Sequence, residues 1–78
     1  MITLEQLRGA RAMLGLTQAE LASRANISTT GLNNIERGAS DPKASTLRAL
    51  QEALEAAGII FEAAGQMIDG GVGIRLKR

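Results

Sequence analysis

Two helix-forming segments with almost no chain between them are the feature that most constrains how this sequence can fold. The helical pattern of apolar residues that starts near Gln18 stops at Asn26, and a new pattern starts after Ser28. Asn26 can adopt the left-handed backbone conformation at tolerable cost, and a serine commonly caps the start of a helix. Two helices joined by about three residues cannot lie antiparallel along their length, so they must cross at a steep angle.

The helix before this crossing pair and the first helix of the pair both begin with a capping box. In this motif a threonine side chain accepts the backbone N–H three residues further on, and the side chain there bonds back to the threonine N–H. The first box predicts a helix over residues 4–14, ended by Gly15, and the second box a helix over residues 18–25. The paired residues are Thr3 with Gln6 and Thr17 with Glu20.

The second helix of the pair is expected to end at Glu36 or Arg37, and the pattern then changes twice. Asp41-Pro42 breaks any helix, so a fourth helix is expected from residue 43 or 44 to residue 57. Beyond Gly58 the apolar residues alternate with a period of two, which is typical of strands, over residues 59–64 and 72–77. The residues of the fourth helix expected to face the core are Leu47, Leu50, Leu54 and Ala57.

Arg11 lies in an unexpected place on the first helix. Its neighbours on the apolar stripe are Leu4, Leu7 and Leu14, which should face the core. An unpaired guanidinium on that side would cost several kcal/mol, by a rough general estimate for a buried charge. The position of Arg11 therefore predicts an acidic partner elsewhere in the chain.

The helix after Ser28 separates its residues into two faces at 100° per residue. The face of short polar side chains suits insertion into a groove of B-DNA, since threonine can bond a phosphate or contact a thymine methyl and asparagine can pair with adenine. Taken alone, the same face could simply be solvated. The packing side contains Ser28, Leu32 and Ile35, with Gly31 and Glu36 at its edges; the opposite side contains Thr29, Thr30, Asn33 and Arg37, with Asn34 at the margin.

Composition excludes several classes of function. The chain has no cysteine and no histidine, and its acidic residues are spread over helical surfaces, so we expect neither an enzyme nor a cofactor or metal site. The formal net charge is only +1, but basic residues outnumber acidic ones up to Leu50. No apolar run approaches the roughly 18 residues needed to cross a bilayer, and no signal-peptide core is visible, so we expect a cytoplasmic protein without a membrane partner.

The crossing pair and its flanks also carry a specific motif. The chain contains Gly15-Leu16-Thr17-Gln18, Glu20-Leu21-Ala22, Ile27-Ser28, Leu32 and Ile35-Glu36-Arg37-Gly38. This run resembles the Cro/phage-repressor (XRE) family of bacterial transcription regulators, whose typical pattern reads "GLTQ-ELA----G-S---I--IERG". The resemblance covers residues 4–58 and implies a mostly α fold, a lambda-repressor-like helix-turn-helix domain of four to five helices, followed here by a short β hairpin or strand pair. It implies a nucleoid-associated bacterial regulator that binds double-stranded DNA.

The resemblance implies roles for individual residues. An arginine of the first helix in this family commonly pairs with the glutamate of "IERG", here Arg11 with Glu36, as a structural ion pair. Thr17 has a simpler alternative role as a helix cap, and Lys43 as an ordinary loop lysine. The residues expected to contact base edges are Ser28, Thr29, Thr30, Asn33 and Asn34. The residues expected to contact the DNA backbone are Thr17, Gln18, Arg37, Ser40 and Lys43.

Two departures from the family pattern affect the DNA-reading helix. Asn26 occupies the turn position where the family usually has glycine, and Gly31 lies inside the helix at a cost of about 1 kcal/mol relative to alanine. The helix also lacks arginine and glutamine at its leading positions. We therefore expect modest base discrimination, directed at thymine methyl groups and adenine.

The segment after the helices is expected to supply the oligomer. We divide the chain into a DNA-binding domain over residues 1–58 and a β extension over residues 59–78 that pairs across a two-fold axis, so that a homodimer represses transcription from a palindromic operator. The alternative for the extension is a hairpin folded back on its own domain. The alternative for the protein is the antitoxin of a toxin–antitoxin pair, whose extension binds a protein toxin. The expected dimerisation residues are Ile59, Phe61, Val72, Ile74 and Leu76.

Overall fold

The computed structural model describes residues 2–61 and 74–76. Within these residues the chain is mostly helical, with a pair of short strands at the end, which confirms the predicted fold class. Each helix begins and ends within one or two residues of its predicted bounds. The elements are α1 (Leu4–Leu14), α2 (Gln18–Arg24), α3 (Thr29–Glu36), α4 (Ala44–Ala56), β1 (Ile59–Phe61) and β2 (Ile74–Leu76).

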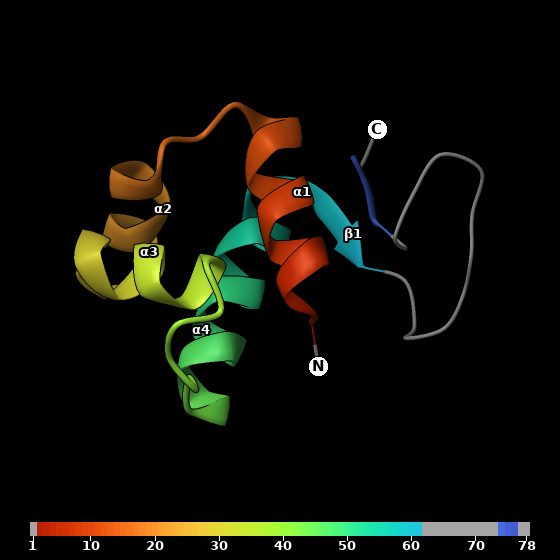
Figure 1. Cartoon of the computed structure of the whole chain (residues 1–78). Coiled ribbons are helices and arrows are strands. Elements are labelled where there is room, and N and C mark those ends of the chain that lie inside the picture. The colour runs from red at the N-terminus through yellow and green to blue at the C-terminus, as the bar shows by residue number, and fades with distance from the viewer. Residues whose placement is uncertain (1, 62–73, 77–78) are drawn as a thin grey trace.

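The ends of the first three helices follow from the capping residues. Thr3 and Thr17 form complete capping boxes with Gln6 and Glu20, so the first N–H groups of α1 and α2 find partners. Asn26 has a φ of 59° in the turn between α2 and α3, which is the left-handed conformation that the sequence predicts there. The turn is short enough that α3 starts at once across the end of α2 (Figure 1).

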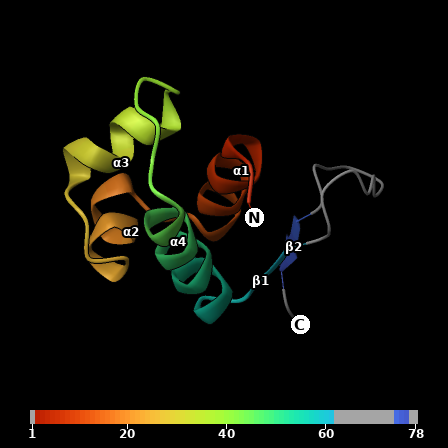
Figure 2. The same ribbon diagram turned by 90° about the horizontal axis from the view of Figure 1, so that it is seen from below.

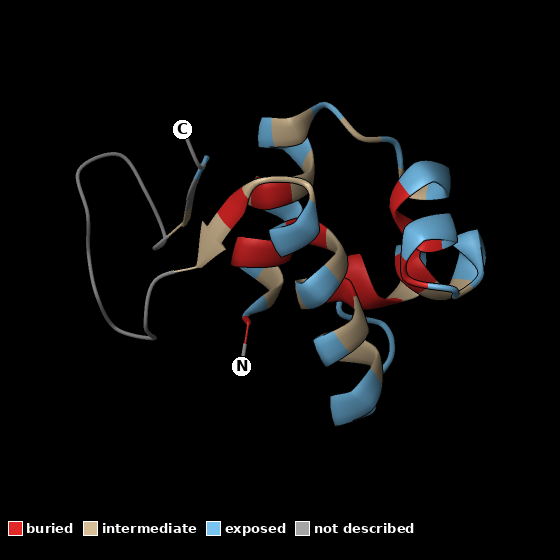
Figure 3. Ribbon diagram, turned by 180° about the vertical axis from the view of Figure 1, so that it is seen from behind, coloured by how far each residue is buried: buried red, intermediate tan, exposed pale blue. Residues whose placement is uncertain are grey.

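The core lies where the four helices meet, as the burial colours in Figure 3 show. Each helix contributes at least one leucine that is fully buried, and smaller apolar residues fill the space between them. Leu50 and Leu54 of α4 are fully buried as expected, whereas Leu47 and Ala57 at the ends of the same stripe are half-buried. The fully buried leucines are Leu7, Leu21, Leu32, Leu50 and Leu54.

The two strands form an antiparallel hairpin within the chain, so the alternative of a hairpin folded back on its own domain describes the structure. Ile59 pairs with Leu76 and Phe61 pairs with Ile74. β1 lies against α4 and β2 lies against α1, at the end of the molecule opposite to α2 and α3 (Figures 1 and 2). The expected strands extend into residues 62–64, 72–73 and 77, which lie outside the described residues.

This packing gives several of the predicted dimerisation residues contacts within their own chain. Ile59 is buried, and Phe61 and Ile74 are partly buried against the core, so the predicted dimer role of these three residues stays a prediction. Among the described residues of that set, Leu76 alone is exposed, at 45%. Val72 lies outside the described residues.

A glycine in the middle of α1 permits the hairpin to approach. A Cβ at Gly9 would lie 2.9 Å from Cδ1 of Ile74, closer than real Cβ atoms come to a neighbour. Glycine inside a helix is unfavourable by roughly 1 kcal/mol relative to alanine. A residue with a Cβ at this position would require the end of the Ile74 side chain to shift.

Candidate nucleic-acid interface

The two faces of α3 differ as the sequence predicts, with one exception. Leu32, Ile35 and Glu36 are buried against the rest of the molecule. Ser28 is exposed rather than packed, because it lies just before the helix and serves as its cap. The outward side is open to solvent along its length and is not covered by the described part of the chain; its exposed residues are Thr29, Thr30, Asn33 and Arg37.

The Ser28 cap lies close to the glycine inside α3. The Ser28 hydroxyl accepts a hydrogen bond of 2.9 Å from the backbone N–H of Gly31. A Cβ at position 31 would lie 2.9 Å from the same oxygen, so a larger residue would require a local shift of the serine hydroxyl. Because the hydroxyl oxygen accepts this bond, its own O–H stays available as a donor at the start of α3.

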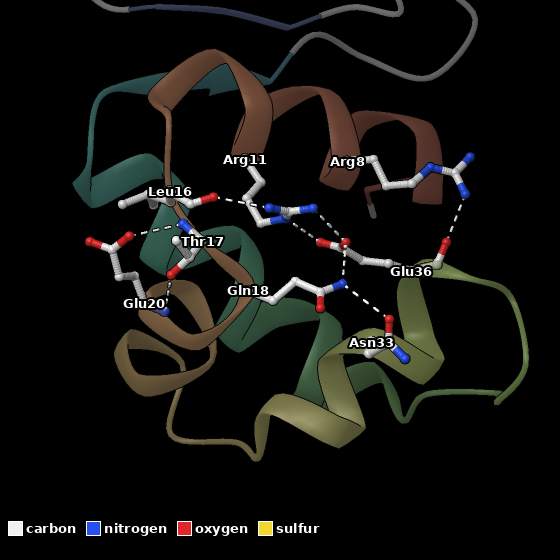
Figure 4. A network of polar contacts seen from close by, with 8 residues as sticks. All are labelled: Arg8, Arg11, Leu16, Thr17, Gln18, Glu20, Asn33 and Glu36. Carbon is white, nitrogen blue, oxygen red and sulfur yellow. Dashed lines mark hydrogen bonds and ion pairs between the residues drawn. The ribbon is translucent and has the colours of Figure 1, made fainter.

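Glu36 is a buried carboxylate that joins three helices (Figure 4). Arg11 of α1 donates from Nε to one carboxylate oxygen at 2.8 Å and from Nη2 to the other at 3.0 Å. This two-point geometry is the strongest form of an arginine–carboxylate pair. The structure thus brings together the two residues that the sequence pairs, and it shows Arg11 half-buried rather than fully inside the core, with 26% of its side chain exposed.

Further bonds from α1 hold the same region. Arg11 Nη1 donates to the carbonyl of Leu16 at 3.0 Å, which fixes the chain just before α2. Arg8 Nη1 donates to the backbone carbonyl of Glu36 at 2.7 Å, at the C-terminal end of α3. A cation at a helix C-terminus complements the helix dipole. Two arginines one helical turn apart therefore clamp α1 to the connection before α2 and to the end of α3.

Gln18 connects α2 to both the buried carboxylate and the outward face of α3. Its side-chain amide Nε2 donates to Glu36 Oε1 at 2.9 Å and to Asn33 Oδ1 at 3.3 Å. Sequence reasoning assigned Gln18 to the DNA backbone and did not find these bonds. The structure leaves Gln18 half-buried beside an exposed asparagine.

Thr17 makes both bonds of its capping box, and these bonds limit what it can offer to DNA. Its backbone N–H donates to the Glu20 carboxylate at 2.9 Å, and its hydroxyl oxygen accepts from the Glu20 N–H at 3.0 Å. Hydrogen bonds from the Thr17 backbone and side chain, with help from the nearby Arg24 charge, lower the pKa of Glu20. The carboxylate already occupies the Thr17 N–H, so the hydroxyl proton is what Thr17 can present to a phosphate.

The remaining residues predicted to contact DNA lie near the C-terminal end of α3 or just after it. Arg37, Ser40 and Lys43 are exposed in the stretch that joins α3 to α4. Asn34 is half-buried, and its backbone carbonyl accepts the N–H of Ala39 at 2.9 Å. Asn34 is therefore the least accessible of the predicted base-contacting residues.

The described residues form neither a metal-binding cluster nor a membrane-spanning helix. They contain no group of three or more acidic, histidine or cysteine side chains that could bind a metal ion. None of the helices in the described ranges is long and apolar enough to span a bilayer. Buried side-chain oxygen and nitrogen atoms in this part of the chain all have a hydrogen-bond partner, so none is left oriented toward a missing ligand.

A short pair of crossed helices, of which the second presents an open polar face, defines a helix-turn-helix DNA-binding protein. The comparison with known families agrees: a family model described as Helix-turn-helix matches residues 7–56. The chain belongs to this family, the Cro/C1-type (XRE) helix-turn-helix proteins, and is a DNA-binding regulator. No curated protein sequence matches the chain.

Proposed function

We propose that this protein is a sequence-specific transcriptional repressor that places α3 in the major groove of double-stranded DNA and acts as a dimer on a palindromic operator. It works in the bacterial cytoplasm, associated with the nucleoid. The observation that carries the proposal is the exposed row of Thr29, Thr30 and Asn33 on a helix whose opposite side is anchored in the core.

The roles of the interface residues follow from their chemistry. Thr29, Thr30 and Asn33 contact base edges, joined by the free hydroxyl of Ser28 and, at the margin, Asn34. The cations and hydroxyl groups around them contact phosphates and set the register of the protein on the duplex. These backbone contacts come from Thr17, Gln18, Arg37, Ser40 and Lys43.

We propose that the dimer forms at the hairpin end, through apolar side chains that stay exposed in the monomer. Leu76 of β2 and Met13 of α1 are large apolar side chains with 45% and 43% of their surface exposed, on two elements that lie against each other. Covering them would bury apolar surface that is unfavourable in water. A dimer would set two copies of α3 on half-sites about 34 Å apart, one turn of B-DNA.

Selection of bound duplexes from random DNA tests this function. The expected result is one enriched sequence with two-fold symmetry, whose halves are separated by about one helical turn. Recovery of no enriched sequence would contradict sequence-specific binding. An enriched half-site without its inverted copy would retain DNA reading and contradict the palindromic dimer.

The oligomeric state is tested with a surface substitution that spares the core. Leu76→Lys removes the exposed leucine without touching the buried Ile59 beside it. We expect a dimer for the wild-type protein by sedimentation velocity, and a monomer for the variant. A stoichiometric second protein co-purifying through this surface from the native host would instead indicate an antitoxin.

A further inference from the structure

Met13 on α1 and Leu76 on β2 form one apolar patch at the hairpin end. Cδ1 of Ile74 lies beside Gly9. Met13 follows Gly9 by four residues, so it lies on nearly the same side of α1, about 6 Å further along the axis. Leu76 follows Ile74 by two residues, so it lies on the same face of β2, about 7 Å further along. β2 lies against α1 and runs in the same direction, which brings the two exposed side chains together (Figure 1).

The patch contains a sulfur atom that solvent reaches, because Met13 is 43% exposed. The chain has no cysteine, so the thioethers of its three methionines are its only sulfur groups. The other two, Met1 and Met67, lie outside the described residues. Oxidation of a thioether to the sulfoxide turns a flexible apolar side chain into a polar one. One added oxygen atom at Met13 therefore changes the chemical character of the patch.

We propose that Met13 is an oxidation site through which a peroxide separates the dimer of this protein into monomers. This inference rests on the dimer contact of the proposed function. In that contact the sulfoxide oxygen leaves water and faces apolar groups such as the Leu76 side chain, which donates no hydrogen bond. A polar group buried without a partner opposes association. A two-fold contact uses the same patch on both subunits, so each dimer buries two such groups.

The reaction transfers one oxygen atom and two electrons. A lone pair of the Met13 sulfur attacks one oxygen of hydrogen peroxide, so that an S–O bond forms while the O–O bond breaks. Sulfur is oxidised and the peroxide is reduced. The proton on the transferred oxygen passes to the leaving hydroxide, which departs as water. Methionine sulfoxide reductases return the sulfoxide to the thioether, so the change is reversible.

The effect on DNA binding follows from where Met13 lies. The hairpin end is opposite to α2 and α3, so oxidation there leaves the proposed base-contacting residues in place (Figures 1 and 2). A dimer bound to one half-site holds its second subunit at a high effective concentration near the other half-site, and a monomer loses this advantage. We expect the oxidised protein to keep its affinity for an isolated half-site and to lose affinity for the palindrome.

Sedimentation velocity of the full chain before and after treatment with hydrogen peroxide tests the proposal. Peptide mass spectrometry identifies the protein that carries one added oxygen at Met13. We expect its dimer dissociation constant to rise by at least about tenfold, the effect of burying unpaired polar groups. Met13→Gln introduces a permanent polar group and should weaken the dimer similarly without any oxidant.

Met13→Leu is the matched control. Leucine retains the apolar volume of methionine and cannot be oxidised in this way. The variant keeps Met1 and Met67, so it also reports any effect of oxidation at those two residues. We expect it to form a dimer as the wild type does and to stay dimeric after the same treatment with hydrogen peroxide.

The dimer should in turn protect Met13 from the oxidant, because the contact buries the thioether. The rate at which Met13 gains oxygen is measured by mass spectrometry at protein concentrations below and above the dimer dissociation constant. We expect slower oxidation at the higher concentration. An equal rate at both concentrations would place the sulfur outside the contact and overturn the proposal.

The remaining outcomes distinguish failure of this inference from failure of the proposed function. A dimer that persists with the sulfoxide at Met13, or that separates equally in treated Met13→Leu, would overturn the oxidation site and leave the proposed dimer in place. A Met13 that gains no oxygen under this treatment would do the same. An untreated wild-type protein that stays monomeric at every concentration would overturn the proposed dimer, and the oxidation site with it.

Discussion

The two ends of the molecule are held to the same core by different kinds of contact. At the α2–α3 end, directional hydrogen bonds from Arg8, Arg11 and Gln18 converge on Glu36. At the hairpin end, apolar side chains such as Ile74 press against a helix at Gly9. Hydrogen bonds depend steeply on angle and distance, whereas apolar contact is non-directional. The comparison indicates that directional bonds fix the orientation of side chains at the α2–α3 end, whereas the hairpin end is attached to the core without such a constraint.

The largest expected effect comes from removing the centre of the hydrogen-bonded end. Glu36→Ala leaves the Arg11 guanidinium half-buried without its partner and should lower the free energy of unfolding by about 3 kcal/mol. The measurement is the urea midpoint followed by circular dichroism. The double substitution Arg11→Met with Glu36→Leu is the control, because replacing both charges with apolar groups should cost clearly less. An unshifted midpoint for Glu36→Ala would show that the ion pair does not stabilise this end.

A smaller and more local effect is expected at the hairpin end. Gly9→Leu places a side chain where Cδ1 of Ile74 lies and should cost roughly 1–3 kcal/mol, the usual range for overpacking. Amide exchange should accelerate in β1 and β2 and stay slow in α3. Ala12→Leu, at an exposed position of the same helix, is the matched control and should change neither. Equal acceleration in α3 would mean that the two ends are not independent.

The smallest effect concerns pH and the capping box of α2. Bonds from Thr17 lower the pKa of Glu20 below its ordinary value of 4.5, so the folded state favours the ionised carboxylate. That stabilisation is present at neutral pH. It is lost as the pH falls below the ordinary pKa of 4.5 and through the lower pKa that Glu20 has in the folded protein. Glu20→Gln retains the reach-back bond without the charge, so its melting temperature should lie slightly below that of the wild type at pH 7. The gap should close at acid pH; a constant gap would contradict the pKa shift.

Sequence reasoning succeeded where a local signal determines the structure. The capping boxes at Thr3 and Thr17 and the left-handed residue Asn26 give the helix bounds, because each acts within a few residues of chain. The place of Arg11 on an apolar stripe required an acidic partner, and the family motif supplied its identity. These features need no knowledge of how distant segments meet.

Long-range geometry was beyond the same reasoning. The bonds from Gln18 to Glu36 and Asn33 depend on the crossing angle of α2 and α3, which a helical wheel of one helix does not contain. The hairpin could have paired within or between chains, since the alternation of its apolar residues is the same in both cases. Gly9 carried a signal that was missed: a glycine in the middle of a helix indicates that something packs close to its backbone.

The central claim is that the exposed face of α3 enters DNA, and one binding series tests it most directly. Arg37→Ala and Asn33→Ala are compared with the wild type on the selected site and on a shuffled duplex, across a range of salt concentrations. We predict that Arg37→Ala weakens binding to both duplexes and reduces the salt slope by about 1, whereas Asn33→Ala reduces the preference for the selected site. Unchanged affinity for both duplexes in both variants at low salt would contradict the account.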